Sequence, residues 1–181
     1  MESNTIEFWD SMAVEYLSRG DKRDNAIEYP MIANWVEGKV LEVGPAFGML
    51  YSHLHFVNRA GYIGLEISQS LIAKAKEFNP TATFIQGDIL NNKISDKSFD
   101  TVVCLQLLEH FNEANFTKAL SELRRIAKDR IIISVPNKEM IPDKSHIQKF
   151  TYESLFNLLK DQGPVMFLPG QEHHILAVQY L

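Results

Sequence analysis

The chain has 181 residues and a net charge of −5, with 45% hydrophobic and 23% charged residues. These values predict one soluble globular domain over 1–181. The single cysteine, Cys104, excludes an internal disulfide. The sequence predicts neither a signal peptide nor a membrane span, and the lack of Lys and Arg clusters disfavours nucleic acid as a partner. We therefore expect a cytoplasmic protein without membrane or nucleic-acid partners, and leave its oligomeric state open.

The N-terminal part predicts two helices. Residues 5–19 carry apolar side chains at helical spacing, which indicates an amphipathic helix. Pro30 fits the first turn of a second, short helix that ends near Trp35. We expect residues 1–36 to form a helical cap on a core over 39–181.

After Lys39, short apolar runs alternate with longer helical patterns, which predicts right-handed βαβ units around a buried parallel sheet. The predicted strands are residues 40–43, 62–67, 82–87, 99–105, 130–135, 165–169 and 174–181. The predicted helices are residues 49–59, 69–78, 113–128 and 152–160, with Ser68 and Thr151 as N-caps of the second and fourth.

The last two predicted strands are joined by only four residues, GQEH, so we expect them to form an antiparallel hairpin at one edge. The expected fold class is thus α/β: a doubly wound, seven-stranded, mostly parallel sheet with a C-terminal hairpin and N-terminal cap helices.

Ligands of such sheets bind beyond the carboxyl ends of the strands, where the strand order reverses. The first strand runs into VLEVGPAFG, whose Gly44 and Gly48 allow a tight turn and a close approach of the backbone. The second strand ends near Glu66, a carboxylate that can accept both hydroxyls of a ribose. After the third strand, Asp88 could accept from an adenine amino group while Ile89 packs on the ring.

With these motifs in this order, the sequence resembles the class I S-adenosylmethionine (SAM)-dependent methyltransferases over nearly the whole chain. LLEH after the fourth strand, SVPN after the fifth and the later SHIQKFTYESLFNLL are similar to the subgroup that acts mainly on small molecules. The resemblance implies SAM as cofactor and S-adenosylhomocysteine (SAH) as product. The residues it assigns to the cofactor are Glu42, Gly44, Pro45, Ala46, Gly48, Glu66, Ile67, Asp88, Ile89, Leu105 and Tyr16.

One position departs from the family pattern. Family members usually have glycine where this chain has Ala46. We expect the additional methyl group to narrow the approach of the methionine carboxylate without abolishing it.

A nicotinamide-dependent dehydrogenase is the main alternative with the same strand pattern. Its G-x-G-x-x-G loop needs glycines at 44, 46 and 49, but this chain has Ala46 and Met49. A second alternative is a SAM-binding protein without turnover that serves as a partner or regulatory subunit. A nucleobase amino-methyltransferase is disfavoured, because CLQLLEH lacks the Asp/Asn-Pro-Pro-aromatic segment that seats a flipped base.

Two histidines are candidates for catalysis. His110 follows the fourth strand, where acceptors dock in the resembling enzymes, and a neutral imidazole could take a proton from a hydroxyl or amine. The alternative is that Glu109 and His110 only organise the start of the next helix. His146, in the loop before the last predicted helix, is the second candidate.

We expect no metal ion, because the neighbouring histidine pairs are badly placed. His53 and His55 face different ways on a predicted helix, and His173 and His174 point to opposite faces of a predicted strand. The sequence thus predicts a methyltransferase that acts on an O, N or C centre of a small-molecule acceptor.

Overall fold

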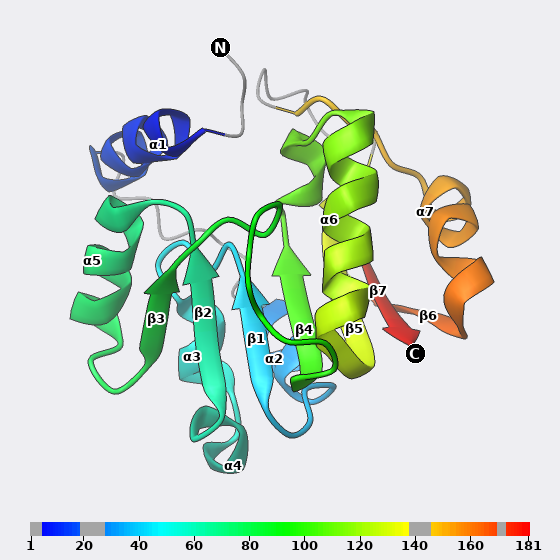
Figure 1. Cartoon of the computed structure of the whole chain (residues 1–181), viewed down its shortest axis with the longest axis horizontal. Helices are drawn as coiled ribbons and strands as arrows, with labels where there is room; N and C mark the ends of the chain where they lie inside the picture. The colour runs from blue at the N-terminus through cyan, green and yellow to red at the C-terminus, as the bar shows by residue number, and fades with distance from the viewer. Residues whose placement is uncertain (1–4, 19–27, 138–145, 170–172) are drawn as a thin grey trace.

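The computed structural model describes residues 5–18, 28–137, 146–169 and 173–181. Its centre is a seven-stranded sheet with the strand order β3-β2-β1-β4-β5-β7-β6 (Figure 1). The strands are β1 (Val40–Val43), β2 (Tyr62–Glu66), β3 (Thr83–Gln86), β4 (Phe99–Leu105), β5 (Ala127–Pro136), β6 (Val165–Leu168) and β7 (His174–Tyr180).

The first five strands are parallel, and β7 runs antiparallel to both β5 and β6. The chain moves outward from β1 through β2 to β3, then returns to place β4 on the other side of β1. This confirms the doubly wound, mostly parallel sheet with an antiparallel C-terminal hairpin. It also puts the reversal of strand order between β1 and β4.

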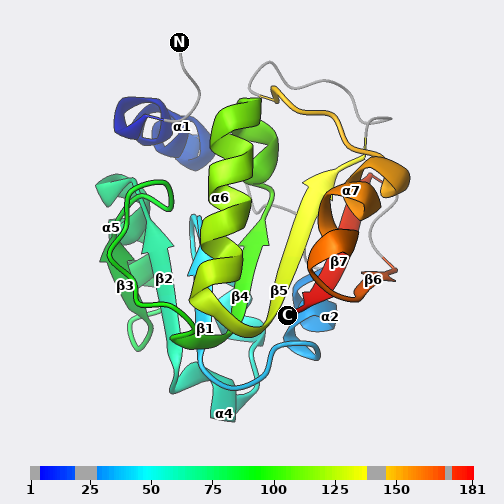
Figure 2. The same cartoon turned by 45° about the vertical axis from the view of Figure 1, so that its right-hand side comes forward.

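Helices cover both faces of the sheet (Figure 2). They are α1 (Ile6–Ser18), α2 (Glu28–Ala33), α3 (Met49–His53), α4 (Phe56–Arg59), α5 (Gln69–Phe78), α6 (Glu113–Ile126) and α7 (Tyr152–Leu159), with two short 3₁₀ helices, η1 (Leu108–His110) and η2 (Lys160–Gln162). Successive strand residues face opposite ways. Val102 therefore packs with α6 and α7 in one core, and Val103 packs with α2, α3 and α5 in the other.

The predicted N-caps of α5 and α7 are confirmed. Ser68 Oγ accepts a hydrogen bond from the Leu71 amide at 3.1 Å, and Thr151 Oγ1 accepts one from the Ser154 amide at 3.0 Å. Each side chain satisfies a backbone donor that has no partner within the helix.

The prediction of one continuous helix over 49–59 is wrong. Leu54 and His55 are extended, with ψ of 144° and 147°, so α3 ends before them and α4 begins after them. Arg59 compensates for the interruption, because its guanidinium donates to the carbonyls of Leu54 and Ser52. The helix predicted over 113–128 ends at Ile126, where β5 takes over.

The N-terminal helices occupy different places. Helix α1 lies at the edge of the sheet toward which the parallel strands point, above α5 (Figure 1). Helix α2 belongs to the helix layer on one face, beside α3. The expected division into a cap over 1–36 and a core over 39–181 stays a prediction.

None of the helices in the described residues combines the length and apolar character needed to cross a membrane.

Candidate functional site

A cleft with about 560 Å³ of open space lies where the strand order reverses, beyond the carboxyl ends of β1, β2 and β4. This is the position at which doubly wound sheets bind ligands. The structure brings six of the predicted cofactor residues together in its lining: Gly44, Ala46, Glu66, Ile67, Asp88 and Ile89.

A smaller cavity adjoins the cleft and shares Gly44, Ala46 and Gln106 with it. Its lining contains the other predicted residues near β1 and β4, namely Glu42, Pro45 and Leu105.

Gly48 is the predicted cofactor residue that lines neither space in the described part of the chain. Gly48 is the N-cap of α3, and a side chain there would meet the Phe84 ring, since an added Cβ would lie 2.6 Å from it. Gly48 therefore serves close packing of the loop against β3. Tyr16 belongs to α1, but its side chain lies outside the described residues.

The loop after β1 has an unusual backbone. Gly44, Ala46 and Gly48 all have left-handed conformations, with φ of 68°, 48° and 68°. Glycine adopts this region without penalty, whereas an L-residue with a Cβ is strained there. The left-handed backbone explains why glycine suits all three positions. Ala46 is the one of the three that has a Cβ, so its backbone conformation is strained.

Glu66 is the buried carboxylate at the floor of the cleft, with 4% of its surface exposed. Its Oε2 accepts from the Ala46 amide at 3.2 Å and its Oε1 accepts from the Ser68 amide at 3.1 Å. A carboxylate has about four lone-pair sites on its two oxygens, so one carboxylate can accept from backbone amides and from ligand hydroxyls together. Glu66 can thus fix the loop after β1 and hold a ribose at the same time.

Glu42 is the second buried carboxylate, on the opposite face of the sheet from Val43. The Tyr62 hydroxyl donates to its Oε2. Burial raises the pKa of Glu42 from 4.5 to about 7, although the Tyr62 hydrogen bond opposes this and the charge of Glu66 adds to it. Glu42 therefore titrates near neutral pH, unlike an exposed glutamate.

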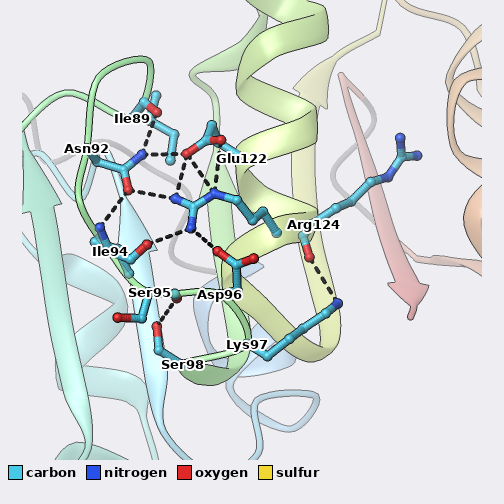
Figure 3. Close-up of polar contacts among 10 residues, drawn as sticks. Ile89, Asn92, Ile94, Ser95, Asp96, Lys97, Ser98, Glu122 and Arg124 are labelled. Carbon is cyan, nitrogen blue, oxygen red and sulfur yellow. Dashed lines mark hydrogen bonds and ion pairs between the residues drawn. The ribbon is translucent and has the colours of Figure 1, made fainter.

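Arg125 of α6 fixes the loop between β3 and β4. Its guanidinium donates to the side chains of Asn92, Asp96 and Glu122 and to the carbonyl of Ile94. Asn92 in turn donates to the carbonyl of Ile89 at 2.8 Å (Figure 3). These contacts hold the segment that brings Asp88 and Ile89 to the cleft, which is the predicted adenine end.

The cleft also contains residues that the sequence analysis did not assign: Trp9, Leu71, Gln106, Leu107 and Phe111. Gln106 follows β4 in a left-handed conformation with φ of 50°, and its amide nitrogen donates to Ser134 Oγ at 2.6 Å. The sequence signal that could have identified Gln106 is its position directly after the end of a predicted strand. Trp9 and Leu71 reach the cleft from helices, and only the fold brings them there.

The two catalytic candidates lie side by side. His110, in η1, is 5% exposed and does not line the cleft, but its ring packs edge-on against Trp9, which does. The rings of His110 and His146 are 5.1 Å apart at 72°. Both Nε2 atoms face Glu109 Oε1, at 3.7 Å for His110 and 4.0 Å for His146.

Cys104 lies in β4 with 1% of its surface exposed. Burial, with the charges of Glu109 and Glu42, raises the pKa of its thiol far above the usual range. A thiol with so little thiolate is a poor nucleophile.

A family model described as a methyltransferase domain matches residues 40–130, half of the chain. The chain therefore belongs to the methyltransferase domain family, and its fold is that of the class I methyltransferases.

One sequence relative and two solved structures illustrate this similarity. An uncharacterized protein of Methanocaldococcus jannaschii is 36% identical over 104 residues, which are 56% of this chain and 42% of that protein. The match thus spans less than half of the length of this relative.

Two solved structures share the fold. Magnesium protoporphyrin IX methyltransferase from Synechocystis PCC 6803 with bound SAH is 16% identical, with a TM-score of 0.71 and 96% of both chains covered. The complex of the Haloferax volcanii Trm112 methyltransferase activator with a putative methyltransferase gives 15% identity and a TM-score of 0.72, covering 94% of this chain and 96% of that one.

Proposed function

We propose that the chain binds SAM and transfers its methyl group to an O, N or C centre of a small-molecule acceptor. The observation that carries this proposal is the buried carboxylate of Glu66 at the floor of the cleft, beside a left-handed loop. A ribose diol and a sulfonium amino acid need such a carboxylate and a closely approaching backbone. They do not need the phosphate loop that a dinucleotide requires.

The residues present fit SAM. In this proposal Glu66 accepts the ribose hydroxyls, Asp88 and Ile89 hold the adenine, and the smaller cavity around Glu42 and Gly44 receives the methionine part. Gly87, which also lines the cleft, allows Leu65 to pack closely against it, since an added Cβ would lie 2.6 Å from Leu65 Cδ1.

SAM supplies a methyl group that its sulfonium has already activated. The chain therefore contributes mainly alignment, because the acceptor atom, the methyl carbon and the sulfur must lie in a line with water excluded. Alignment of this kind can lower a barrier by up to about 7–11 kcal/mol. A general base is an additional requirement for a hydroxyl acceptor, and His110 and His146 are our candidates for it.

A small acceptor is favoured by two features. The net charge of −5 does not favour a polyanionic substrate. The Synechocystis neighbour is named for a small molecule, magnesium protoporphyrin IX, and its fold covers 96% of this chain.

Calorimetry with SAH, SAM and NAD⁺ tests the proposal directly. We expect one SAH or SAM site per chain and no response to NAD⁺. Mass spectrometry of small molecules that copurify with the chain then offers candidate acceptors for assay with methyl-labelled SAM. Tight NAD⁺ binding without a response to SAH would refute the proposal, and SAH binding with no turnover of any acceptor would favour a non-catalytic SAM-binding subunit.

A further inference from the structure

Glu109, His110 and His146 form a compact group of potential metal ligands. Glu109 and His110 belong to η1 after β4, whereas His146 comes from the segment before α7. We propose that these three residues bind one divalent first-row transition-metal ion beside the cleft. The use of this ion rests on the proposed methyl transfer, but its binding can be measured without turnover.

The separations between the ligand atoms support a shared ion. His110 Nε2 and His146 Nε2 lie 3.7 and 4.0 Å from the same oxygen, Glu109 Oε1, and all three ligand atoms lie within 4.8 Å of one another. A tetrahedral ion with bonds of about 2.0–2.2 Å to nitrogen and oxygen holds its ligand atoms about 3.3–3.6 Å apart. Small side-chain rotations would bring the three ligand atoms, which lie within 4.8 Å of one another, to these separations.

The type of donor selects the ion. Two imidazole nitrogens with one carboxylate oxygen suit zinc, iron, cobalt or nickel better than calcium or magnesium, which prefer sites made of oxygen. Three protein ligands also leave coordination positions open for water or a substrate atom.

The local structure holds the group in place before any ion binds. The amides of Ile147 and Gln148 donate to the Glu109 carbonyl at 2.8 and 3.0 Å, so the main chain attaches the segment of His146 to η1. Glu109 and His110 are 1% and 5% exposed, and the side chain of His146 is 19% exposed. An ion here would therefore be largely shielded from bulk water. It would remain accessible from solvent on the side of His146, the most exposed of the three ligands.

The position defines a class of acceptor. His110 packs against Trp9, and Trp9 and Phe111 line the cleft proposed for SAM. An ion at this point would bind an acceptor through a hydroxyl, or through two neighbouring oxygens, next to the methyl donor. We infer that the acceptor is an oxygen-bearing small molecule.

Cobalt titration of the full chain, prepared without a histidine tag and stripped with EDTA, tests the site. We expect a saturable visible absorption band from one Co²⁺ per chain. His146→Ala should weaken Co²⁺ binding at least about tenfold, and Glu109→Gln should weaken it in the same direction. His55→Ala is the matched control, because His55 is exposed at the start of α4 and contacts Asn34.

The outcomes separate this inference from the proposed function. Absence of saturable Co²⁺ binding, or equal Co²⁺ affinity in the wild type and His146→Ala, would overturn the proposed metal site. SAH calorimetry on the same samples tests the cofactor site independently. Circular dichroism checks that each variant is folded. If His146→Ala fails to fold, His146→Gln preserves the approximate size of the side chain while removing the imidazole ligand, and the same loss of Co²⁺ affinity is expected.

Discussion

Glu66 Oε2 accepts a hydrogen bond from the amide of Ala46 at 3.2 Å, which ties the end of β2 to the loop after β1. The same carboxylate that is proposed to hold the ribose therefore also shapes the loop proposed to hold the methionine part. The two halves of the site depend on one side chain, so removing it should affect the cofactor and the loop together.

Glu66→Ala should lower SAH affinity tenfold or more. Two hydrogen bonds from ribose hydroxyls to a charged group are lost, each worth roughly 1.5–3 kcal/mol. The change also leaves the Ala46 and Ser68 amides without this acceptor, so we expect a loss of stability of about 1–3 kcal/mol as well. Calorimetry with SAH and urea unfolding measure the two effects.

Glu66→Gln and Glu77→Ala complete this test. Glutamine retains one acceptor oxygen, so the effect of Glu66→Gln should be smaller. Exposed Glu77 pairs with Lys74 in α5, so Glu77→Ala should leave SAH affinity unchanged. Wild-type SAH affinity in a folded Glu66→Ala variant would show that Glu66 does not hold the ribose.

Ala46→Gly should stabilise the chain by about 0.5–1 kcal/mol and keep or improve SAH affinity. An L-residue pays roughly 1–2 kcal/mol in the left-handed region that Ala46 occupies, and glycine regains this at a smaller cost from the flexibility of the unfolded chain. Thermal unfolding and SAH calorimetry provide the measurement.

The control for Ala46→Gly is Ala60→Gly. Ala60 is exposed with a right-handed φ of −63°, so glycine there should destabilise the chain slightly. Loss of SAH affinity in Ala46→Gly would mean that the alanine methyl group makes a contact the cofactor site needs.

The sequence predicted the regular part of the fold because its signals are local. All seven strands, and the Ser68 and Thr151 caps, follow from apolar runs and from single side chains next to helix starts. The interruption at Leu54 could not be predicted in this way, because it depends on Arg59 reaching back to carbonyls in the folded chain.

The candidate site divides in the same manner. Glu66 and Asp88 are found from strand ends, and they line the cleft. Trp9 enters it from α1, and His146 meets His110 across a long stretch of sequence. Such contacts depend on tertiary packing. Histidines close in sequence therefore do not predict the group of Glu109, His110 and His146, whose members come from two distant segments.

Glu42 should make stability depend on pH between about 5 and 8. Its pKa is raised from 4.5 to about 7 by burial, so the folded chain binds a proton more tightly than the unfolded chain. This contribution is complete below the unfolded pKa and is lost as the pH rises through 7. Over that range we expect the wild type to lose about 2–3 kcal/mol relative to Glu42→Gln.

Urea unfolding of both variants at several pH values measures this difference. Groups that titrate in both proteins cancel in the comparison, and the lowered pKa values of Asp100 and Glu122 confine their effects to more acidic solutions. Parallel stability curves for the wild type and Glu42→Gln between pH 5 and 8 would show that Glu42 has an ordinary pKa in the folded chain.

The last prediction concerns His110. Glutamine at this position keeps much of the side-chain volume against Trp9 but can neither bind a metal through an imidazole nor accept a proton near neutral pH. For a hydroxyl acceptor, His110→Gln should therefore lower kcat by roughly 10²–10⁴, while SAH affinity stays nearly unchanged because His110 does not line the cleft. Steady-state kinetics with an acceptor identified by mass spectrometry, across a range of pH, measures this.

The pH profile and the metal dependence then assign the role. If His110 is a general base, the wild type loses activity in acid as the imidazole is protonated, and the variant should lack that limb of the profile. If His110 acts by holding a metal ion, EDTA should lower wild-type kcat toward that of His110→Gln, and Co²⁺ should restore only the wild type. A loss confined to KM would make His110 an acceptor-binding residue, and full activity in the variant would leave it with a packing role against Trp9.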